Sequence, residues 1–486
     1  MSRRLLPFLF AVPAIAAAPP KESDYYPIQP VPNPDNYVLE VGGLERAPDG
    51  TIYAATRRGE VFRVTGAEDN DLSRAKISVF ARGMHECLGA AWRDGALYVQ
   101  QRPELTRLKD EDADGRADVF DTVSDHYGLS GDYHEYAFGS RPDNHGDFWI
   151  VHCLTGSFTS DVMWRGWALK VSPDGKTTPV CSGIRSPGGI GFNAEGDVFY
   201  TDNQGPWNGS SSLKWLKPGS FQGHPETFRW YDKAPHLTKP VVPIDNTRMV
   251  KERERNPLLV PPAVMLPHGR VGQSPTAIVC DTTGGKFGPF KNQLFVGDQC
   301  YSNIARVFLE KVDGLYQGVV IPWVEGFGSG IIGMVLTPKG QMFAGGSDRG
   351  WGARGGKAFN FDRLVWTGKA PFEVLEMRAQ PDGFTLTFTL PVDRATAEKT
   401  ESYKMDAWTW AFRAEYGGPE VDAVTPAVTA AEVSADGLQV RLRINGIVKG
   451  HVHHLKSTGV RSADGLPLLH TDAYYTLNNI PAADRN

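Results

Sequence analysis

The residues from Gly183 to Pro206, GIRSPGGIGFNAEGDVFYTDNQGP, place an arginine on a turn rich in glycine and proline and end in Gln204-Gly205-Pro206. Glycine permits close approach of the backbone to a ligand, and proline fixes the turn angle. The guanidinium of Arg185 offers a planar fork for a carboxylate. This spacing predicts a loop that binds an anionic group.

A second motif, DEDADGRADVFD from Asp110 to Asp121, has the residue order of an EF-hand calcium loop. Carboxylates stand at positions 1, 3, 5, 9 and 12, and glycine stands at position 6. We expect six calcium ligands, with Asp118 acting through water: Asp110, Asp112, Asp114, the carbonyl of Arg116, Asp118 and Asp121. The bound ion would pin a loop between strands, and the alternative is a solvated acidic turn.

A third candidate is His134 in GDYHEYAFG, just before a predicted strand. Its ordinary pKa near neutrality suits a base that takes a proton from a sugar hydroxyl. The alternative is a histidine packed at the rim beside Tyr133 and Tyr136. Glu135 is a competing acid or base, but we expect its side chain on the opposite face of the strand.

Two further groups of basic residues lie on predicted rim loops. His268 and Arg270 precede the fifth repeat described below, and Arg349 and Arg354 lie in RGWGARGG. Such arginines bind carboxylates through two parallel hydrogen bonds, so we expect His268 and Arg270 to contact a cofactor. Charge on a surface loop is the alternative.

Aromatic residues between Trp207 and Tyr231 could stack on sugar faces or pack between strands. Three C-terminal histidines, His451, His453 and His454, have no nearby acid or cysteine that would indicate a metal site. We interpret these histidines as structural.

The elements that position these residues form a repeat of an apolar strand, a turn with glycine and a strand rich in Tyr, Phe, Val and Thr. The repeat occurs six times, about fifty residues apart, beginning at Leu44, Gly89, Tyr136, Ile190, Ile278 and Met334. The sequence therefore predicts an all-β chain with a six-bladed β-propeller over 37–368 and an insertion at 207–270. An array of β-sandwiches is the alternative.

The two ends of the chain differ from this repeat. Long strands of alternating polarity over 369–486 predict a small Ig-like β-sandwich. Residues 1–16 have the charged, apolar and small-residue regions of a signal peptide, and 17–36 read as an extended leader. The apolar run is too short for a membrane anchor, and no later segment is suited to cross a membrane. We therefore expect an exported protein, periplasmic or secreted.

Composition excludes several classes of partner. The formal net charge of −5 provides no basic field for nucleic acid. Five cysteines permit at most two internal disulfides, and a chain of this length requires none. Because C-x-x-C-H is absent, we expect no c-type haem.

Several of these segments resemble one known family. The order G-x-R-S-P-x-G, a strand and Q-G-P is similar to a signature of the soluble quinoprotein glucose/sorbosone dehydrogenases. The segments DYHEYAFG, RGWGARGG and LVWTGKAPFE most closely resemble sorbosone-dehydrogenase-like exported propellers of Planctomycetes and Verrucomicrobia. Ser186 stands where the family has an asparagine, and the region of Cys300 where it has a cofactor-binding lysine.

The resemblance implies pyrroloquinoline quinone and calcium as cofactors. It implies that His134 is the base, that Arg185 anchors the quinone and that Gly205 and Pro206 supply carbonyl ligands to calcium. The expected function is oxidation of a sugar hydroxyl, with electrons passed to an external acceptor. One alternative is a metal-dependent sugar lactonase that uses Asp202, Asp298 and Asp348. The other is a carbohydrate-binding envelope protein without catalysis.

Overall fold

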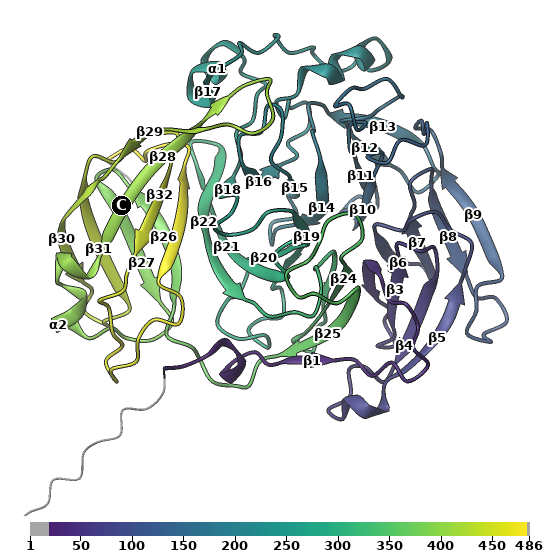
Figure 1. The fold of residues 1–486 in the computed structure, drawn as a ribbon, viewed down its shortest axis with the longest axis horizontal. Helices are drawn as coiled ribbons and strands as arrows, with labels where there is room; N and C mark the ends of the chain where they lie inside the picture. The colour runs from purple at the N-terminus through teal and green to yellow at the C-terminus, as the bar shows by residue number, and fades with distance from the viewer. Residues whose placement is uncertain (1–18, 484–486) are drawn as a thin grey trace, which may run out of the picture.

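Residues 19–483 are described by a computed structural model, in which six antiparallel blades of four strands each form a ring with a β-sandwich beside it (Figure 1). The predicted all-β class, a six-bladed propeller followed by a sandwich, is confirmed. The expected signal peptide, residues 1–16, lies outside the described residues. No helix within 19–483 is long and apolar enough to cross a membrane.

Each blade has four antiparallel strands side by side, with the first at the central channel and the fourth at the outer edge. From the innermost strand outward, blade 1 contains β2 (Val41–Arg46), β3 (Ile52–Thr56), β4 (Val61–Thr65) and β5 (Lys76–Ala81), and blade 2 contains β6 (Ala90–Arg93), β7 (Ala96–Gln100), β8 (Leu105–Lys109) and β9 (Val119–Ser124). Blade 3 contains β10 (Ala137–Pro142), β11 (Phe148–His152), β12 (Ala168–Val171) and β13 (Thr177–Cys181), and blade 4 contains β14 (Pro187–Phe192), β15 (Val198–Asp202), β16 (Ser211–Trp215) and β18 (Val264–Leu266). Blade 5 contains β19 (Pro275–Cys280), β20 (Leu294–Asp298), β21 (Asn303–Val312) and β22 (Leu315–Val324), and blade 6 contains β23 (Gly333–Leu336), β24 (Gln341–Ser347), β25 (Phe359–Val365) and β1 (Ile28–Pro30).

The inner strands close a ring, because each contacts the next and β23 contacts β2. Glycines let these strands approach one another near the axis. A Cβ at Gly43 would lie 2.8 Å from the Gly89 carbonyl carbon, and one at Gly189 would lie 2.5 Å from the Thr276 carbonyl oxygen. The glycines of the inner strands are therefore required by crowding around the channel.

The outer strand of blade 6 comes from the N-terminal segment expected as a leader. Strand β1 pairs with β25, with Ile28 opposite Leu364 and Pro30 opposite Asp362. A proline fits here because an edge strand does not need every N–H for pairing. The first described residues thus join the sheet that ends the propeller.

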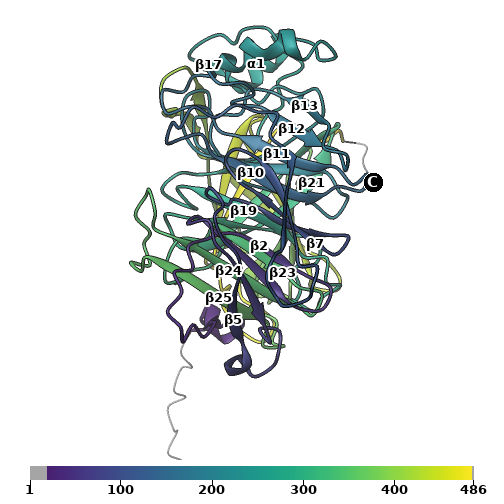
Figure 2. The ribbon, with the colours of Figure 1, turned by 90° about the vertical axis from the view of Figure 1, so that its right-hand side faces the viewer.

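Blade 4 carries the long excursion. Strands β16 and β18 lie within the expected insertion 207–270, and the chain leaves the blade between them over 216–263. This excursion contains a 3₁₀ helix (Pro225–Lys233), β17 (Thr247–Arg248) and α1 (Met249–Arg255). In Figure 2 α1 and β17 lie at the end of the molecule opposite β5.

The sandwich shares a sheet with blade 5. One of its sheets contains β26 (Val374–Gln380), β27 (Gly383–Phe388), β31 (Gln439–Asn445) and β30 (Ala427–Val433). The other contains β29 (Glu420–Val424), β28 (Lys404–Phe412), β32 (His451–Lys456) and β33 (Asp472–Leu477), and β33 pairs with β22 of the propeller. The short helix α2 (Arg394–Ala397) lies between β27 and β28.

One hydrophobic core spans that junction. Phe308, Val319 and Ile321 of blade 5 pack with Phe384 and Tyr475 of the sandwich. Strand β17 of the excursion also pairs with β28. The sandwich is therefore attached through backbone hydrogen bonds as well as buried side chains.

The five cysteines are all free thiols. The C-terminal histidines His451, His453 and His454 are buried in the sandwich. Burial, followed by the nearby His451, lowers the pKa of His453 to about 3. These buried side chains agree with the structural interpretation of the three histidines.

Candidate functional site

One rim of the propeller surrounds a mouth of the central channel. Each inner strand begins and each second strand ends at this rim, because the two form a hairpin. A cavity of about 40 Å³ lies there. We call this region the channel mouth; residues lining its cavity include Arg57, Tyr136, Ser186, Asn203, Gln299 and Trp351.

The imidazole of His134 stands among aromatic rings at the channel mouth. Its centroid lies 5.7 Å from that of Trp351 and 6.3 Å from that of Phe158. The backbone N–H of His134 donates to Asp132 Oδ1 over 2.8 Å. Its Nδ1 is buried and has no hydrogen-bond partner in the described part of the chain.

The electrostatics of the site keep His134 neutral. Burial, and then the positive charge of Arg185, lower the pKa of His134 from its usual 6.5. A neutral imidazole with a free ring nitrogen is able to accept a proton at neutral pH. The geometry and the charge state therefore both suit a base.

Glu135 has a different role from His134. Its side chain is fully buried, and its carboxylate accepts hydrogen bonds from Ser130 N, Ser130 Oγ and Gly131 N. These contacts brace the loop that carries His134. Glu135 therefore supports the loop from within, as its predicted orientation implied.

Arg185 is buried just before β14 without an anionic partner. It is 4% exposed, and its Cζ lies 4.7 Å from the Phe158 ring centroid and 5.1 Å from that of Tyr416. Within residues 19–483 its guanidinium forms no ion pair, and its Nε has no hydrogen-bond partner. A buried cation is costly without a counter-ion, so this arrangement suits an anionic ligand.

The turn Gly205-Pro206 contacts Arg185 directly. A Cβ at position 205 would collide with the Arg185 guanidinium, so glycine is required there. Gly205 and Asn208 exchange backbone hydrogen bonds of 2.9 and 3.1 Å, and the Gly205 carbonyl is the acceptor of the second. The structure thus brings Gly205 and Arg185 together.

Two groups near Arg185, Lys214 and His224, were not found from the sequence. Asp202 accepts from Ser186 N over 2.8 Å and from Lys214 Nζ over 3.0 Å, and both side chains of this ion pair are buried. Burial, and then Arg185, lower the pKa of His224 to about 3. Lys214 and His224 lie in or beside the excursion of blade 4, where no motif marks them.

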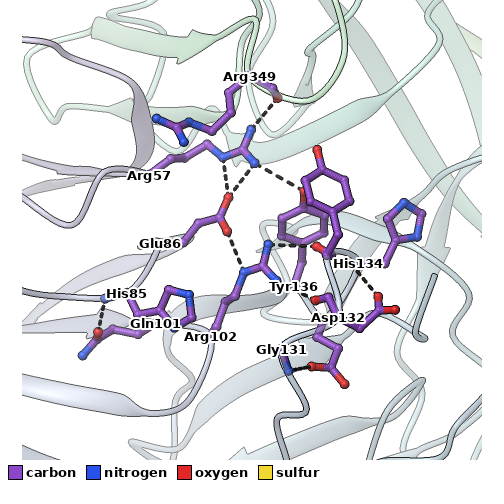
Figure 3. Close-up of polar contacts among 12 residues, drawn as sticks. Arg57, His85, Glu86, Gln101, Arg102, Gly131, Asp132, His134, Tyr136 and Arg349 are labelled. Atoms are coloured by element: carbon purple, nitrogen blue, oxygen red, sulfur yellow. Dashed lines mark hydrogen bonds and ion pairs between the residues drawn. The ribbon is translucent and has the colours of Figure 1, made fainter.

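A second charged cluster connects several loops of the mouth (Figure 3). Glu86 bonds to Arg57 Nη2 at 2.5 Å and to Arg102 Nε at 2.6 Å. Arg57 also donates to the Arg349 carbonyl, and Arg102 lies over the Tyr136 ring at 4.5 Å. Glu86 pairs with both arginines and so holds these loops together, whereas Arg185 has no such carboxylate partner among the described residues.

The other predicted rim residues are engaged elsewhere. Arg270 pairs with Glu420 of the sandwich at 2.9 Å and covers the Trp408 ring at 4.4 Å. His268 donates its backbone N–H to Ser210 Oγ, and its Nδ1 is buried without a partner in the described residues. Arg349 pairs with Glu40, and Arg354 lies over Tyr301. Arg270 therefore faces the sandwich.

The acidic loop 110–121 connects β8 and β9 at the rim away from the channel mouth. Asp110, Asp112 and Asp118 each place a carboxylate oxygen within 4.8 Å of the others. Asp114 accepts from the N–H of Arg116, and Asp121 pairs with Arg107 across β8 and β9. Three of the six predicted calcium ligands are thus brought together.

The acids expected for a lactonase do not converge. Asp202 pairs with Lys214, and Asp298 accepts from the N–H groups of Gln273 and Tyr301. Asp348 is exposed. Within residues 19–483 the group Asp110, Asp112 and Asp118 is the one acid, histidine or cysteine cluster arranged for a metal.

The propeller is similar to solved structures of sugar dehydrogenases. A protein from Thermus thermophilus described as a glucose dehydrogenase superposes with a TM-score of 0.51 at 18% identity, over 70% of this chain and 99% of that one. The quinone-bound aldose sugar dehydrogenase of Streptomyces coelicolor gives 0.50 at 15% identity, over 72% and 99%. No protein-family model and no curated protein sequence matches the chain. At these identities the likeness shows the fold.

Proposed function

We propose that the protein is an exported sugar dehydrogenase that oxidises a sugar hydroxyl with bound pyrroloquinoline quinone and calcium. The observation that carries the proposal is the pair at the channel mouth: a neutral His134 with a free Nδ1 and a buried Arg185 with no counter-ion. Proteins of similar fold named as glucose and aldose sugar dehydrogenases support the reaction class.

The residues present fit one anionic end of a planar quinone. Arg185 supplies the charge, and the rings of Phe158 and Tyr416 shield it from water. Asn203 Oδ1 is buried at the same mouth without a partner among the described residues. The turn at Gly205 and Pro206 is the proposed source of carbonyl ligands for calcium.

The chain's own contribution to the reaction is proton transfer and orientation. His134 takes the proton of the hydroxyl at sugar C1 on its free ring nitrogen. The quinone, when bound, supplies the acceptor for the hydrogen and electron pair that leave C1. The product is the lactone, and an external acceptor removes the electrons afterwards.

The test is reconstitution of the purified protein with the quinone and calcium, followed by dye-linked oxidation of aldoses. We expect His134→Gln to lower kcat by about 10²- to 10⁴-fold, the usual contribution of a positioned base. The matched control is His145→Gln, because His145 is an exposed histidine on the turn between β10 and β11. Equal activity of the two variants would contradict the role of His134.

The sugar-lactonase alternative is not favoured, because its acids are engaged in structural contacts. A carbohydrate-binding protein without catalysis is the other outcome of the test. Saturable sugar binding with no oxidation in the presence of the quinone would establish it.

A further inference from the structure

Exposed aromatic side chains gather at the channel mouth. In the part of the chain described here, four aromatic residues are among the well-exposed large hydrophobic side chains: Phe120, Tyr133, Trp351 and Tyr416. Three of them surround His134 and Arg185, and they are exposed by 51%, 40% and 58%. Phe120 lies on β9, the outer edge of blade 2.

These rings form a continuous band. Trp351 lies 5.8 Å from Tyr133 and 5.7 Å from His134, measured between ring centroids. On the other side of His134, Phe158 follows at 6.3 Å and Tyr416 lies 6.0 Å beyond it. We call these five residues the aromatic band. With His134 in its middle, it is longer than a single sugar ring.

The aromatic residues between Trp207 and Tyr231, which could either stack on sugars or pack between strands, are not part of this band. Trp207, Trp215, Phe221 and Tyr231 of blade 4 and its excursion are buried. Their faces are packed against neighbouring side chains and cannot receive a ligand. The exposed faces belong instead to loops of blades 3 and 6 and to the sandwich.

Tyr416 is held at the end of the band by the sandwich. The loop after β28 docks on the turn of blade 4 through Trp207 N to Arg413 O at 2.7 Å and Gly418 N to Gly209 O at 3.0 Å. Arg413 Nε donates to Gly417 O at 2.9 Å and braces the loop around Tyr416. A ring held in place by the protein loses little entropy when a ligand stacks on it.

We infer that the substrate is an oligosaccharide or the end of a glycan chain, with the reacting unit at His134 and a further unit stacked on Tyr416. The inference rests on the proposed sugar oxidation and adds the substrate class. The apolar face of a sugar ring packs on an aromatic face, and its edge hydroxyls stay with water. The cavity of about 40 Å³ is too small to enclose a sugar, so the ligand lies across the open band.

The dependence of binding affinity on oligosaccharide length tests this inference directly. Calorimetric titration without quinone uses gluco-, xylo- and manno-oligosaccharides from the monosaccharide to the pentasaccharide. We expect the affinity in at least one series to rise about tenfold or more between the monosaccharide and the trisaccharide, since each stacked ring contributes on the order of 1 kcal/mol.

Variants assign the effect to Tyr416. Tyr416→Ala should remove most of the gain in affinity with length, and Tyr416→Phe should keep the gain. Phe120→Ala, an exposed ring outside the band, is the matched control and should change nothing. Melting curves establish that each variant is folded.

Two results would overturn the inference: equal affinity at every length in all series, or an unchanged gain with length in Tyr416→Ala. Length-dependent binding that requires Tyr416, without any sugar oxidation after quinone addition, would support the glycan site and contradict the dehydrogenase. The two proposals therefore fail separately.

Discussion

At the scale of single residues, the site depends on the charge relation between His134 and Arg185. Two motifs, GDYHEYAFG and GIRSPGG, predicted these residues separately, and the fold places both at the channel mouth. Arg185 lowers the pKa of His134, while the carboxylate of Asp132 raises it. The two neighbours therefore pull the titration of one histidine in opposite directions.

This relation gives a prediction on His134 alone. Arg185→Gln removes a nearby positive charge, so the pKa of His134 should rise. Asp132→Asn removes a negative charge, so the same pKa should fall. Titration of the His134 ring protons by NMR, without cofactor or substrate, measures both changes. Shifts of the same sign in the two variants would contradict the arrangement.

Other residues of the site could not be predicted, for a physical reason. Glu86, Arg57 and Arg102 lie in loops of two blades and share no spacing that would connect them. The lowered pKa of His224 follows from burial beneath Arg185, which only the folded chain shows. Sequence motifs thus indicated His134 and Arg185, whose Nδ1 and Nε have no hydrogen-bond partner among the described residues. They did not indicate the surrounding residues that position the loops of the site.

At the scale of elements, turns with glycine predicted the blade hairpins well. Gly50 in APDG has φ of +92° and joins β2 to β3, a conformation that favours glycine. Strand β1 escaped prediction because it is three residues long, contains a proline and pairs only through the distant β25. Local signals predict hairpins, and they carry no information about such distant pairing.

The loop between β8 and β9 carries the calcium prediction. We expect calcium bound through Asp110, Asp112 and Asp118 to raise the free energy of unfolding by up to about 2.7 kcal/mol at a hundredfold excess over Kd, and so to raise the unfolding temperature. Asp112→Ala should abolish the effect, and Glu111→Gln in the same loop should retain it. Calorimetry with and without a chelator measures the shift. No calcium binding in the intact protein would refute the site.

At the scale of the whole molecule, the N-terminal segment is tied to the sandwich. His470 of the sandwich bonds to Glu373 at 2.6 Å and to Glu22 of the N-terminal segment at 3.2 Å. Burial lowers the pKa of His470, but the Glu373 carboxylate and the Glu22 hydrogen bond outweigh burial and raise the pKa to about 9. The protonated histidine thus joins the N-terminal segment to the sandwich.

The tie predicts a pH dependence of stability. Because the folded pKa is raised, the stabilisation is fully present below the unfolded pKa near 6.5 and is lost as pH rises through about 9. Its magnitude is on the order of 1–3 kcal/mol. The difference in melting temperature between the native chain and His470→Gln should shrink from pH 6 to pH 9.5, and a constant difference would contradict the tie.

The propeller and the sandwich are joined by a shared sheet and a shared hydrophobic core. Strand β33 pairs with β22, and the side chains of blade 5 lie in the core of the sandwich. Alternating polarity predicted the sandwich itself, but pairing between Val320 and Tyr474 has no local signal. Through this connection the sandwich places Tyr416 over Arg185.

The most direct test of the central claim is equilibrium binding of pyrroloquinoline quinone to the calcium-loaded protein, with the quenching of tryptophan fluorescence as the measure of binding. We expect saturable binding that weakens at least about tenfold in Arg185→Gln, since a charge-assisted contact to a carboxylate contributes about 1.5–3 kcal/mol. Arg229, which forms an exposed ion pair with Asp161, provides the control: Arg229→Gln should leave quinone binding unchanged. Absence of saturable binding, or equal binding in Arg185→Gln, would contradict the claim that the channel mouth is a quinone site.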